Sequence, residues 1–197
     1  MREIRRILAD VPALELVSPD DVGLAPLPEE DDLEPYDTFE ENARSKARHF
    51  RQRSGLPTVA DDSGLEVDAL GGAPGVRSKR FAPVVDGTSD DERDLANNAY
   101  LLEQLRERAP GERSGRYVCV VVLDEGDGLP LTLRGEAAGT IALEPTGSGG
   151  FGYDPVFVEG ATGRTFAELS ADEKNARSHR GAAFRRLTEV LRRRAPL

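Results

Sequence analysis

The sequence predicts a mixed α/β fold in which helices flank a sheet, and three observations support this class. Residues 117–123 are apolar at consecutive positions, which is typical of a central strand covered on both faces. Long helices are expected from Thr38 to about Ser54 and, capped by Ser89 or Thr88, through Leu105, because Thr and Ser can cap the first helical turn. The chain has 197 residues, enough to bury a sizeable core within one ordinary domain. We therefore expect a single domain that spans residues 1–197.

The other elements are predicted from periodicity and from turn residues. They are an amphipathic helix at 2–9, strands at 14–17, 129–134 and 139–143, a short capped helix that opens at Ser170, and a C-terminal helix at 181–194. The inward stripe of the helix at 89–105 is expected to consist of Leu95, Ala99, Leu102 and Leu105. The acidic connection at 18–36 reads as a solvated loop.

Charge and cysteine content exclude several classes of protein. The chain has 36 acidic and 26 basic residues, and its formal net charge of −10 argues against nucleic acid or an anionic membrane as the main partner. The single cysteine, Cys119, lies in the apolar run, so we expect a buried small hydrophobe and no disulfide framework. Nothing resembles a signal peptide or a membrane span, and the expected location is the cytoplasm.

The stretch Ala60-Asp61-Asp62-Ser63-Gly64-Leu65 places two adjacent carboxylates at the end of a predicted buried strand. Carboxylate oxygens suit a hard cation such as Mg²⁺, and a carboxylate beside a metal-bound water can act as its base. However, Asp, Ser and Gly also dominate turns, because they form local hydrogen bonds. On these six residues alone, a turn is the favoured interpretation.

The loop at 146–155 surrounds Phe151 and Tyr153 with glycines. Glycines let a backbone come close to a ligand, and an exposed aromatic ring stacks on a nucleobase with about 1–3 kcal/mol. The alternative is a tight loop whose Phe151 fills the core, and the sequence supports both interpretations equally. Asn42 and Lys46 stand one helical turn apart and could face the same ligand, although such pairs mostly face solvent. His179 on its own is no evidence for catalysis.

Five blocks of the sequence occur in a characteristic order and spacing. They are Thr38-Phe39-Glu40-Glu41-Asn42-Ala43 with Lys46, the stretch from Ala60 to Leu65, Leu70-Gly71-Gly72-Ala73-Pro74-Gly75, Gly149-Gly150-Phe151-Gly152-Tyr153-Asp154-Pro155, and Glu173-Lys174-Asn175 with Ser178-His179-Arg180. Together they resemble the non-canonical purine nucleoside triphosphate pyrophosphatases, the inosine triphosphatase family. The resemblance covers nearly everything from Thr38 to the C-terminus.

This resemblance implies a long, curved, mixed sheet flanked by helices, with two lobes and a central cleft for the substrate. It also implies a Mg²⁺-dependent homodimer that converts inosine, deoxyinosine and xanthosine triphosphates to the monophosphate and pyrophosphate. The partner would thus be a small-molecule nucleotide, with no nucleic acid and no membrane.

The resemblance further implies a role for each matched residue. Asp62 would be the proton acceptor and a metal ligand, with Asp61 beside it and Glu34 as the second metal carboxylate. Ser63 would bind substrate, and Lys46 would neutralise phosphate charge. The base would be held by Phe151, Gly152, Tyr153 and Asp154, and the purine and sugar side would be completed by Lys174, His179 and Arg180. Because Arg180 offers only donors, it would accept a 6-oxo purine and oppose the 6-amino group of adenine.

Two other function classes stay open. One is a pyrophosphatase for modified pyrimidine nucleotides, although the Phe151 block and Ser178-His179-Arg180 match the purine family specifically. The other is a catalytically weak nucleotide-binding protein. Family members normally begin with a buried strand and a Ser/Thr-x-Asn-x-x-Lys loop, whereas this chain opens at Met1-Arg2-Glu3-Ile4, which resembles the helix after that loop. We therefore expect the 197-residue form to be less stable and less active than one extended upstream by the strand and loop.

Overall fold

The computed structural model describes residues 2–9, 11, 12, 14–85 and 87–194, so Met1 and any strand before it lie outside the described residues. The chain divides into two compact units that are interleaved along the sequence. Unit 1 consists of Met1–Asp62, Cys119–Gly135 and His179–Leu197, and unit 2 consists of Ser63–Val118 and Glu136–Ser178. The single domain expected from the sequence stays a prediction.

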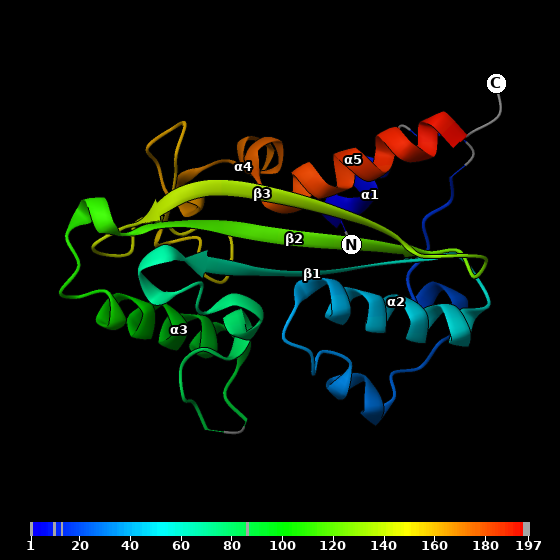
Figure 1. Cartoon of the computed structure of the whole chain (residues 1–197), viewed down its shortest axis with the longest axis horizontal. Helices are drawn as coiled ribbons and strands as arrows, with labels where there is room; N and C mark the ends of the chain where they lie inside the picture. Colours follow the sequence, from blue (N-terminus) through cyan, green and yellow to red (C-terminus); the bar gives the residue numbers. More distant parts are fainter. Residues whose placement is uncertain (1, 10, 13, 86, 195–197) are drawn as a thin grey trace. The chain divides into compact units, whose positions relative to one another are not determined.

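Within the described ranges, four strands form one sheet, and their order in the sheet is their order in the chain. They are β1 (Thr58–Val67), β2 (Ser114–Asp124), β3 (Leu131–Ile141) and β4 (Phe157–Glu159). Strand β3 pairs antiparallel with β4, and the arrows of β1, β2 and β3 alternate in direction in Figure 1. The mixed α/β class is therefore confirmed. The described strands form an antiparallel sheet, where the resemblance implied a mixed one.

Unit 1 contains the helices α1 (Arg2–Leu8), α2 (Phe39–Ser54) and α5 (His179–Arg194), with short 3₁₀ turns at Asp20–Val22 and Pro28–Asp32. Helix α2 begins after Thr38, whose Oγ1 accepts a hydrogen bond from the Glu41 N–H at 3.2 Å, and it ends at Gly55 with φ 70°. The core of unit 1 consists of Leu8, Val11, Cys119, Val121, Leu123, Ala183, Phe184 and Leu187. Cys119 is buried, as the sequence predicts.

Unit 2 contains α3 (Asp90–Gln104), α4 (Ala171–Arg177) and 3₁₀ turns at Asp68–Leu70, Gly75–Arg80, Pro110–Glu112 and Phe166–Glu168. Ser89 and Ser170 form the capping boxes of α3 and α4, which confirms both predicted helix starts. The core of unit 2 consists of Leu65, Val67, Leu101, Leu105, Tyr117, Ala137, Ile141, Tyr153, Val156, Phe157, Phe166 and Leu169.

Two predictions about strands are wrong. Residues 14–17 have no regular structure: Leu14 and Glu15 are exposed, and Leu16 packs on the unit 1 core. The two strands predicted at 129–134 and 139–143 are one continuous strand, β3. Gly135 lies inside it because α5 passes close by: a Cβ at this position would stand 2.2 Å from the His179 carbonyl oxygen. The glycine therefore permits close packing and does not break the strand.

The predicted inward face of α3 is confirmed for Leu102 and Leu105, which pack in the unit 2 core, and is wrong for Leu95 and Ala99. Leu95 and Ala99 are exposed, whereas Asn97 and Asn98 are buried. Both asparagines face inward because their amide groups form hydrogen bonds there, as described below. The C-terminal helix begins at His179, two residues before the predicted start. Among the described residues, no helix has the length and apolar character that crossing a membrane requires.

Candidate functional site

Strand β1 continues through the central stretch, so the turn interpretation is wrong. Asp61, Asp62 and Ser63 lie in the middle of a ten-residue strand rather than after it. Successive side chains of a strand point to opposite faces. Asp61 and Asp62 therefore belong to different faces of the sheet, and in unit 1 these faces are covered by α5 and α2 (Figure 1).

Asp62 faces helix α2 and forms what we call the carboxylate cluster, consisting of Glu34, Asn42, Lys46 and Asp62. Asn42 Nδ2 donates to Asp62 Oδ2 at 3.0 Å, and Lys46 Nζ lies 3.6 Å from Asp62 Oδ1. The same Lys46 Nζ donates to Glu34 Oε1 at 2.6 Å. The i, i+4 spacing of Asn42 and Lys46 thus brings both side chains to one carboxylate. The side chain of Asp62 is 11% exposed and that of Glu34 is 40% exposed, so the cluster has a buried side and an open side.

Asn42 also holds the chain segment that carries Glu34. Its Oδ1 accepts from the Tyr36 N–H at 2.9 Å, and its Nδ2 donates to the Tyr36 carbonyl oxygen at 3.2 Å. Asn42 itself is 1% exposed. One buried amide therefore connects the Tyr36 backbone with the carboxylate of Asp62.

Asp61 lies in a separate cluster on the α5 side. Arg180 Nη2 is 3.0 Å from Asp61 Oδ2, Arg180 Nε donates to the same oxygen at 3.1 Å, and Cys119 Sγ lies 3.6 Å from it. Only two of the three predicted metal carboxylates, Glu34 and Asp62, therefore converge. In line with this, no group of three or more His, Cys, Asp or Glu side chains within the described ranges is arranged to hold a metal ion.

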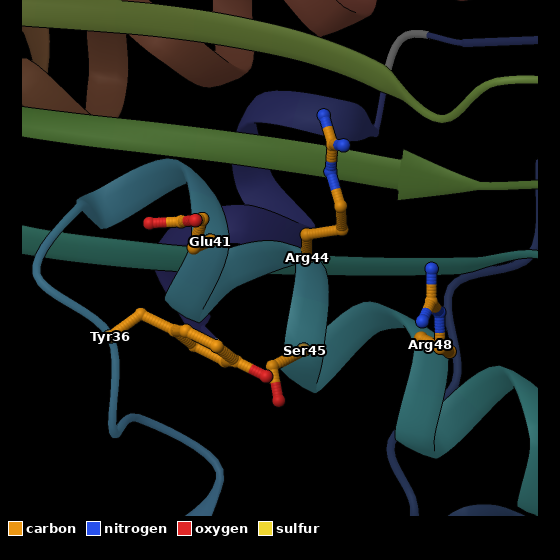
Figure 2. A pocket seen from close by; sticks show the side chains of 5 residues that line it. All are labelled: Tyr36, Glu41, Arg44, Ser45 and Arg48. Carbon is orange, nitrogen blue, oxygen red and sulfur yellow. The ribbon is translucent and has the colours of Figure 1, made fainter.

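A pocket of about 230 Å³ borders the next face of α2, lined by Tyr36, Glu41, Arg44, Ser45 and Arg48 (Figure 2). Figure 2 shows the Tyr36 ring beside Ser45, while the side chains of Arg44 and Arg48 extend upward in the view. None of the predicted site residues lines this pocket. We therefore locate the candidate chemistry in the carboxylate cluster and not in the pocket.

In unit 2, the loop at 146–155 presents an aromatic ring to solvent. Phe151 is 62% exposed, whereas Tyr153 is buried and donates its hydroxyl hydrogen to the Ser78 carbonyl oxygen at 2.8 Å. The interpretation in which Phe151 fills the core is therefore wrong, and Tyr153 has that place. Lys174 Nζ lies 4.4 Å from the centre of the Phe151 ring, within the range of a cation–π contact.

Asp154 holds the same loop through contacts with the Phe151 backbone and Lys174. Its Oδ2 accepts from the Phe151 N–H at 2.9 Å and forms an ion pair with Lys174. Burial raises the pKa of Asp154 above its ordinary value, although the positive charge of Lys174 counteracts this. Burial, reinforced by the negative charge of Asp94, raises the pKa of Tyr153 far above neutrality, so Tyr153 remains a hydrogen-bond donor.

Two residues of α3 form a clamp on this loop that the sequence reasoning missed. Asp94 Oδ2 accepts from the Gly152 N–H at 2.6 Å, and Asn98 Nδ2 donates to the Gly152 carbonyl oxygen at 2.8 Å. Asp94 and Asn98 stand one helical turn apart, so both polar backbone groups of one glycine meet the same helix face. The available signal was the pair Asn97-Asn98 within an otherwise amphipathic helix.

The predicted residues thus fall into groups that belong to different units. Phe151, Gly152, Tyr153, Asp154 and Lys174 are brought together in unit 2, and Ser63 lies on the unit 2 part of β1. Glu34, Lys46 and Asp62 meet in unit 1, where His179 is the buried first residue of α5 and Arg180 follows it.

A mixed α/β fold with paired carboxylates beside a lysine, and with an exposed ring on a glycine-rich loop, has the features expected of a protein that handles phosphorylated planar ligands. Comparison with known proteins makes this specific. The profile of the Ham1 family matches residues 1–190, and the chain belongs to this family.

Similar proteins cover almost the whole chain. A dITP/XTP pyrophosphatase of Frankia alni is 48% identical over 98% of this chain and 92% of its own length. The dITP/XTP pyrophosphatase of Escherichia coli O157:H7 is 43% identical with the same coverage. Among solved structures, a HAM1 protein from Coxiella burnetii is 40% identical, has a TM-score of 0.82, and is matched over 96% of this chain and 91% of that one.

Proposed function

We propose that this protein hydrolyses non-canonical purine nucleoside triphosphates, namely dITP, ITP and XTP, to the monophosphate and pyrophosphate. This removes such nucleotides from the nucleotide pool. The observation that carries the proposal is the convergence of Glu34, Lys46 and Asp62 in one unit of a Ham1-family chain. The names of its relatives as dITP/XTP pyrophosphatases support the substrate class.

The carboxylate cluster fits a divalent cation, and we propose Mg²⁺. Carboxylate oxygens of Glu34 and Asp62 both lie close to the positive charge of Lys46, and hard oxygen donors are what Mg²⁺ prefers. Glu34 and Asp62 would hold the ion, which would supply charge shielding for the triphosphate. We leave Asp61 out of the ligand set, since its carboxylate binds Arg180.

The chain's own groups then act as follows. Asp62 accepts a proton from the attacking water, and the Asn42 amide keeps its carboxylate oriented. Lys46 stabilises the negative charge that develops on the transferred phosphoryl group. Lys46 contacts both carboxylates, so its ammonium group lies at the proposed metal site.

Nucleoside recognition is assigned to the unit 2 loop together with residues from other segments. The Phe151 ring stacks on the base, and Gly152, Tyr153, Asp154 and Lys174 fix the loop or contact the nucleoside. Ser63, His179 and Arg180 complete the substrate contacts. The Asp61 carboxylate accepts from Nε and pairs with Nη2 of Arg180. This contact orients the guanidinium so that its other donors can bind the oxygen of a 6-oxo purine.

The test is pyrophosphate release from dITP, ITP, XTP, ATP, GTP and a modified pyrimidine triphosphate, with Mg²⁺ and with a chelator. We expect turnover of the first three only with Mg²⁺, and discrimination against ATP on the order of 10⁴-fold at best. Equal turnover of ATP and ITP would contradict the proposed base recognition. Preference for a modified pyrimidine triphosphate would favour a pyrophosphatase for modified pyrimidine nucleotides. Unchanged rates in chelator would contradict the proposed metal requirement. Sedimentation of the same samples tests the homodimer, which we also propose.

A further inference from the structure

We infer that Asn42 is a positioning residue that fixes the two carboxylates of the cluster relative to each other. The inference rests on the proposed function, because it assumes that Glu34 and Asp62 hold the metal ion. It concerns a residue that touches neither metal nor substrate in the proposed arrangement. Asn42 acts through Asp62 on one side and through the backbone of Tyr36 on the other.

All hydrogen-bonding groups of the Asn42 amide have partners in this arrangement. Its Oδ1 accepts from the Tyr36 N–H, and its two Nδ2 hydrogens are used by the Tyr36 carbonyl oxygen at 3.2 Å and by Asp62 Oδ2 at 3.0 Å. Only one orientation of the amide satisfies these partners, since the two acceptors need the nitrogen and the N–H needs the oxygen. The amide is therefore specific for this site, and neither a carboxylate nor a hydroxyl offers the same set.

The position of Tyr36 explains why this connection affects Glu34. Glu34 lies two residues before Tyr36, in the connection that leads into α2 and has no strand or helix of its own. Both backbone polar groups of Tyr36 are bound to Asn42, so the segment is tied to α2 close to Glu34. Lys46, one turn further along α2, then contacts Glu34 and Asp62 from the same helix. Asn42 and Lys46 thereby set the separation of the two carboxylates.

Without the Asn42 amide, the carboxylate of Glu34 should no longer be held at a fixed position relative to Asp62, although the protein stays folded. Substituting residues that orient metal ligands typically weakens metal affinity by about 10- to 100-fold. Misplacement of a reacting group by about 1 Å can cost on the order of 100-fold in rate. We therefore expect a lower kcat and weaker metal binding, with little change in the KM for dITP.

The experiment compares Asn42→Leu, which keeps the volume, and Asn42→Ser with the matched controls Asn97→Leu and Asn97→Ser. Asn97 is a suitable control because it is also a helical asparagine, is 2% exposed, and has three hydrogen bonds to backbone groups of Ser78, Lys79 and Ala82. Mn²⁺ binding is measured by electron paramagnetic resonance without nucleotide, beside melting temperature, kcat and KM.

We expect the Asn42 variants to bind Mn²⁺ about 10-fold more weakly and to lose about 10- to 100-fold in kcat, with KM within about threefold of the wild type. The Asn97 variants should lower the melting temperature and leave Mn²⁺ binding unchanged. If the Asn42 variants only melt earlier, as the controls do, or if Asn42→Leu is unfolded by circular dichroism, Asn42 serves the fold and the inference is wrong. Asp62→Asn distinguishes a failure of this inference from a failure of the proposed function. If that variant keeps Mn²⁺ binding and turnover, the proposed site itself is wrong.

Discussion

The carboxylate cluster of unit 1 and the Phe151 loop of unit 2 are each held in place by a helix, but they differ in the exposure of their charged groups. In each, a helix binds both backbone polar groups of one loop residue: Asn42 holds Tyr36, and Asp94 and Asn98 hold Gly152. The side chain of Glu34 in unit 1 is 40% exposed, whereas the side chain of Asp154 in unit 2 is 3% exposed and paired with Lys174. Unit 1 therefore exposes a carboxylate, whereas unit 2 buries its ion pair and exposes the Phe151 ring.

The largest expected effect is that of Asp62→Asn. The amide has the same volume but accepts no proton, so we expect kcat to fall by about 10²- to 10⁴-fold, with an unchanged circular dichroism spectrum. Asp61→Asn is the matched control, because Asp61 pairs with Arg180 on the other face. It should affect KM and the preference for dITP over dATP more than kcat. Near-normal pyrophosphate release by Asp62→Asn at saturating Mg²⁺ would remove Asp62 from the mechanism.

Replacing the two lysines sharpens the contrast between the units. Lys46→Met should lower kcat by about 10²- to 10³-fold and change stability little, since Glu34 is open to solvent and Asp62 keeps the hydrogen bond from Asn42. Lys174→Met leaves the buried Asp154 without its cation and should destabilise the fold by about 3 kcal/mol at pH 7. Urea unfolding and steady-state kinetics on both variants check this. If Lys46→Met and Lys174→Met change kcat and stability to the same degree, the proposed difference between the two units is wrong.

Phe151→Ala tests whether the exposed ring contacts the base. Loss of a stacking contact of about 1–3 kcal/mol should raise the KM for dITP by roughly 5- to 150-fold and leave kcat nearly unchanged. Leu143→Ala is the control, because Leu143 is another exposed apolar side chain of unit 2. A KM equal to that of the control would mean that the ring does not bind substrate.

A smaller effect is expected from the α3 clamp. Asp94→Ala removes the acceptor of the Gly152 N–H and should lower the free energy of unfolding by about 1–3 kcal/mol. We expect a modest rise in KM, because the loop that carries Phe151 is held less firmly. Asp91→Ala, an exposed aspartate on the same helix, should do neither. If both variants behave alike, the clamp has no part in shaping the loop.

The smallest effect concerns pH and the helix that carries Lys174. Hydrogen bonds from Arg164, and then from Ser170, lower the pKa of Glu173 to about 2. A lowered pKa means that this carboxylate contributes stability above its ordinary value of 4.5, and the contribution is lost as pH falls towards about 2. The melting temperature of Glu173→Gln should therefore be lower than that of the wild type at pH 7, with a smaller difference at pH 3. A difference that does not depend on pH would contradict this.

Local signals in the sequence predicted a large part of the fold. Thr38, Ser89 and Ser170 marked helix starts correctly, and the apolar run at 117–123 marked β2, because capping and strand burial depend on neighbouring residues. Asn42 and Lys46, one helical turn apart, both contact Asp62, and their facing a common ligand stays a prediction.

Long-range partners were not predictable in the same way. Asp61, Asp62 and Ser63 have turn-forming side chains, but pairing within the sheet keeps them extended. The contact of Asp61 with Arg180 joins residues that are 119 positions apart, and the inward asparagines of α3 follow from loops that the helix meets only in the folded chain.

The interleaving of the two units has a consequence for how the protein can be divided. The chain passes between them after Asp62, Val118, Gly135 and Ser178, and the first three of these positions lie inside β1, β2 and β3. No contiguous gene fragment therefore encodes either unit, and three of the crossings have no linker that a protease could cut without breaking a strand. Folding must close long segments before either core is complete, which slows it relative to a chain with local contacts. Inserted or permuted versions should tolerate new ends in the turn at 125–128 far better than at any unit boundary.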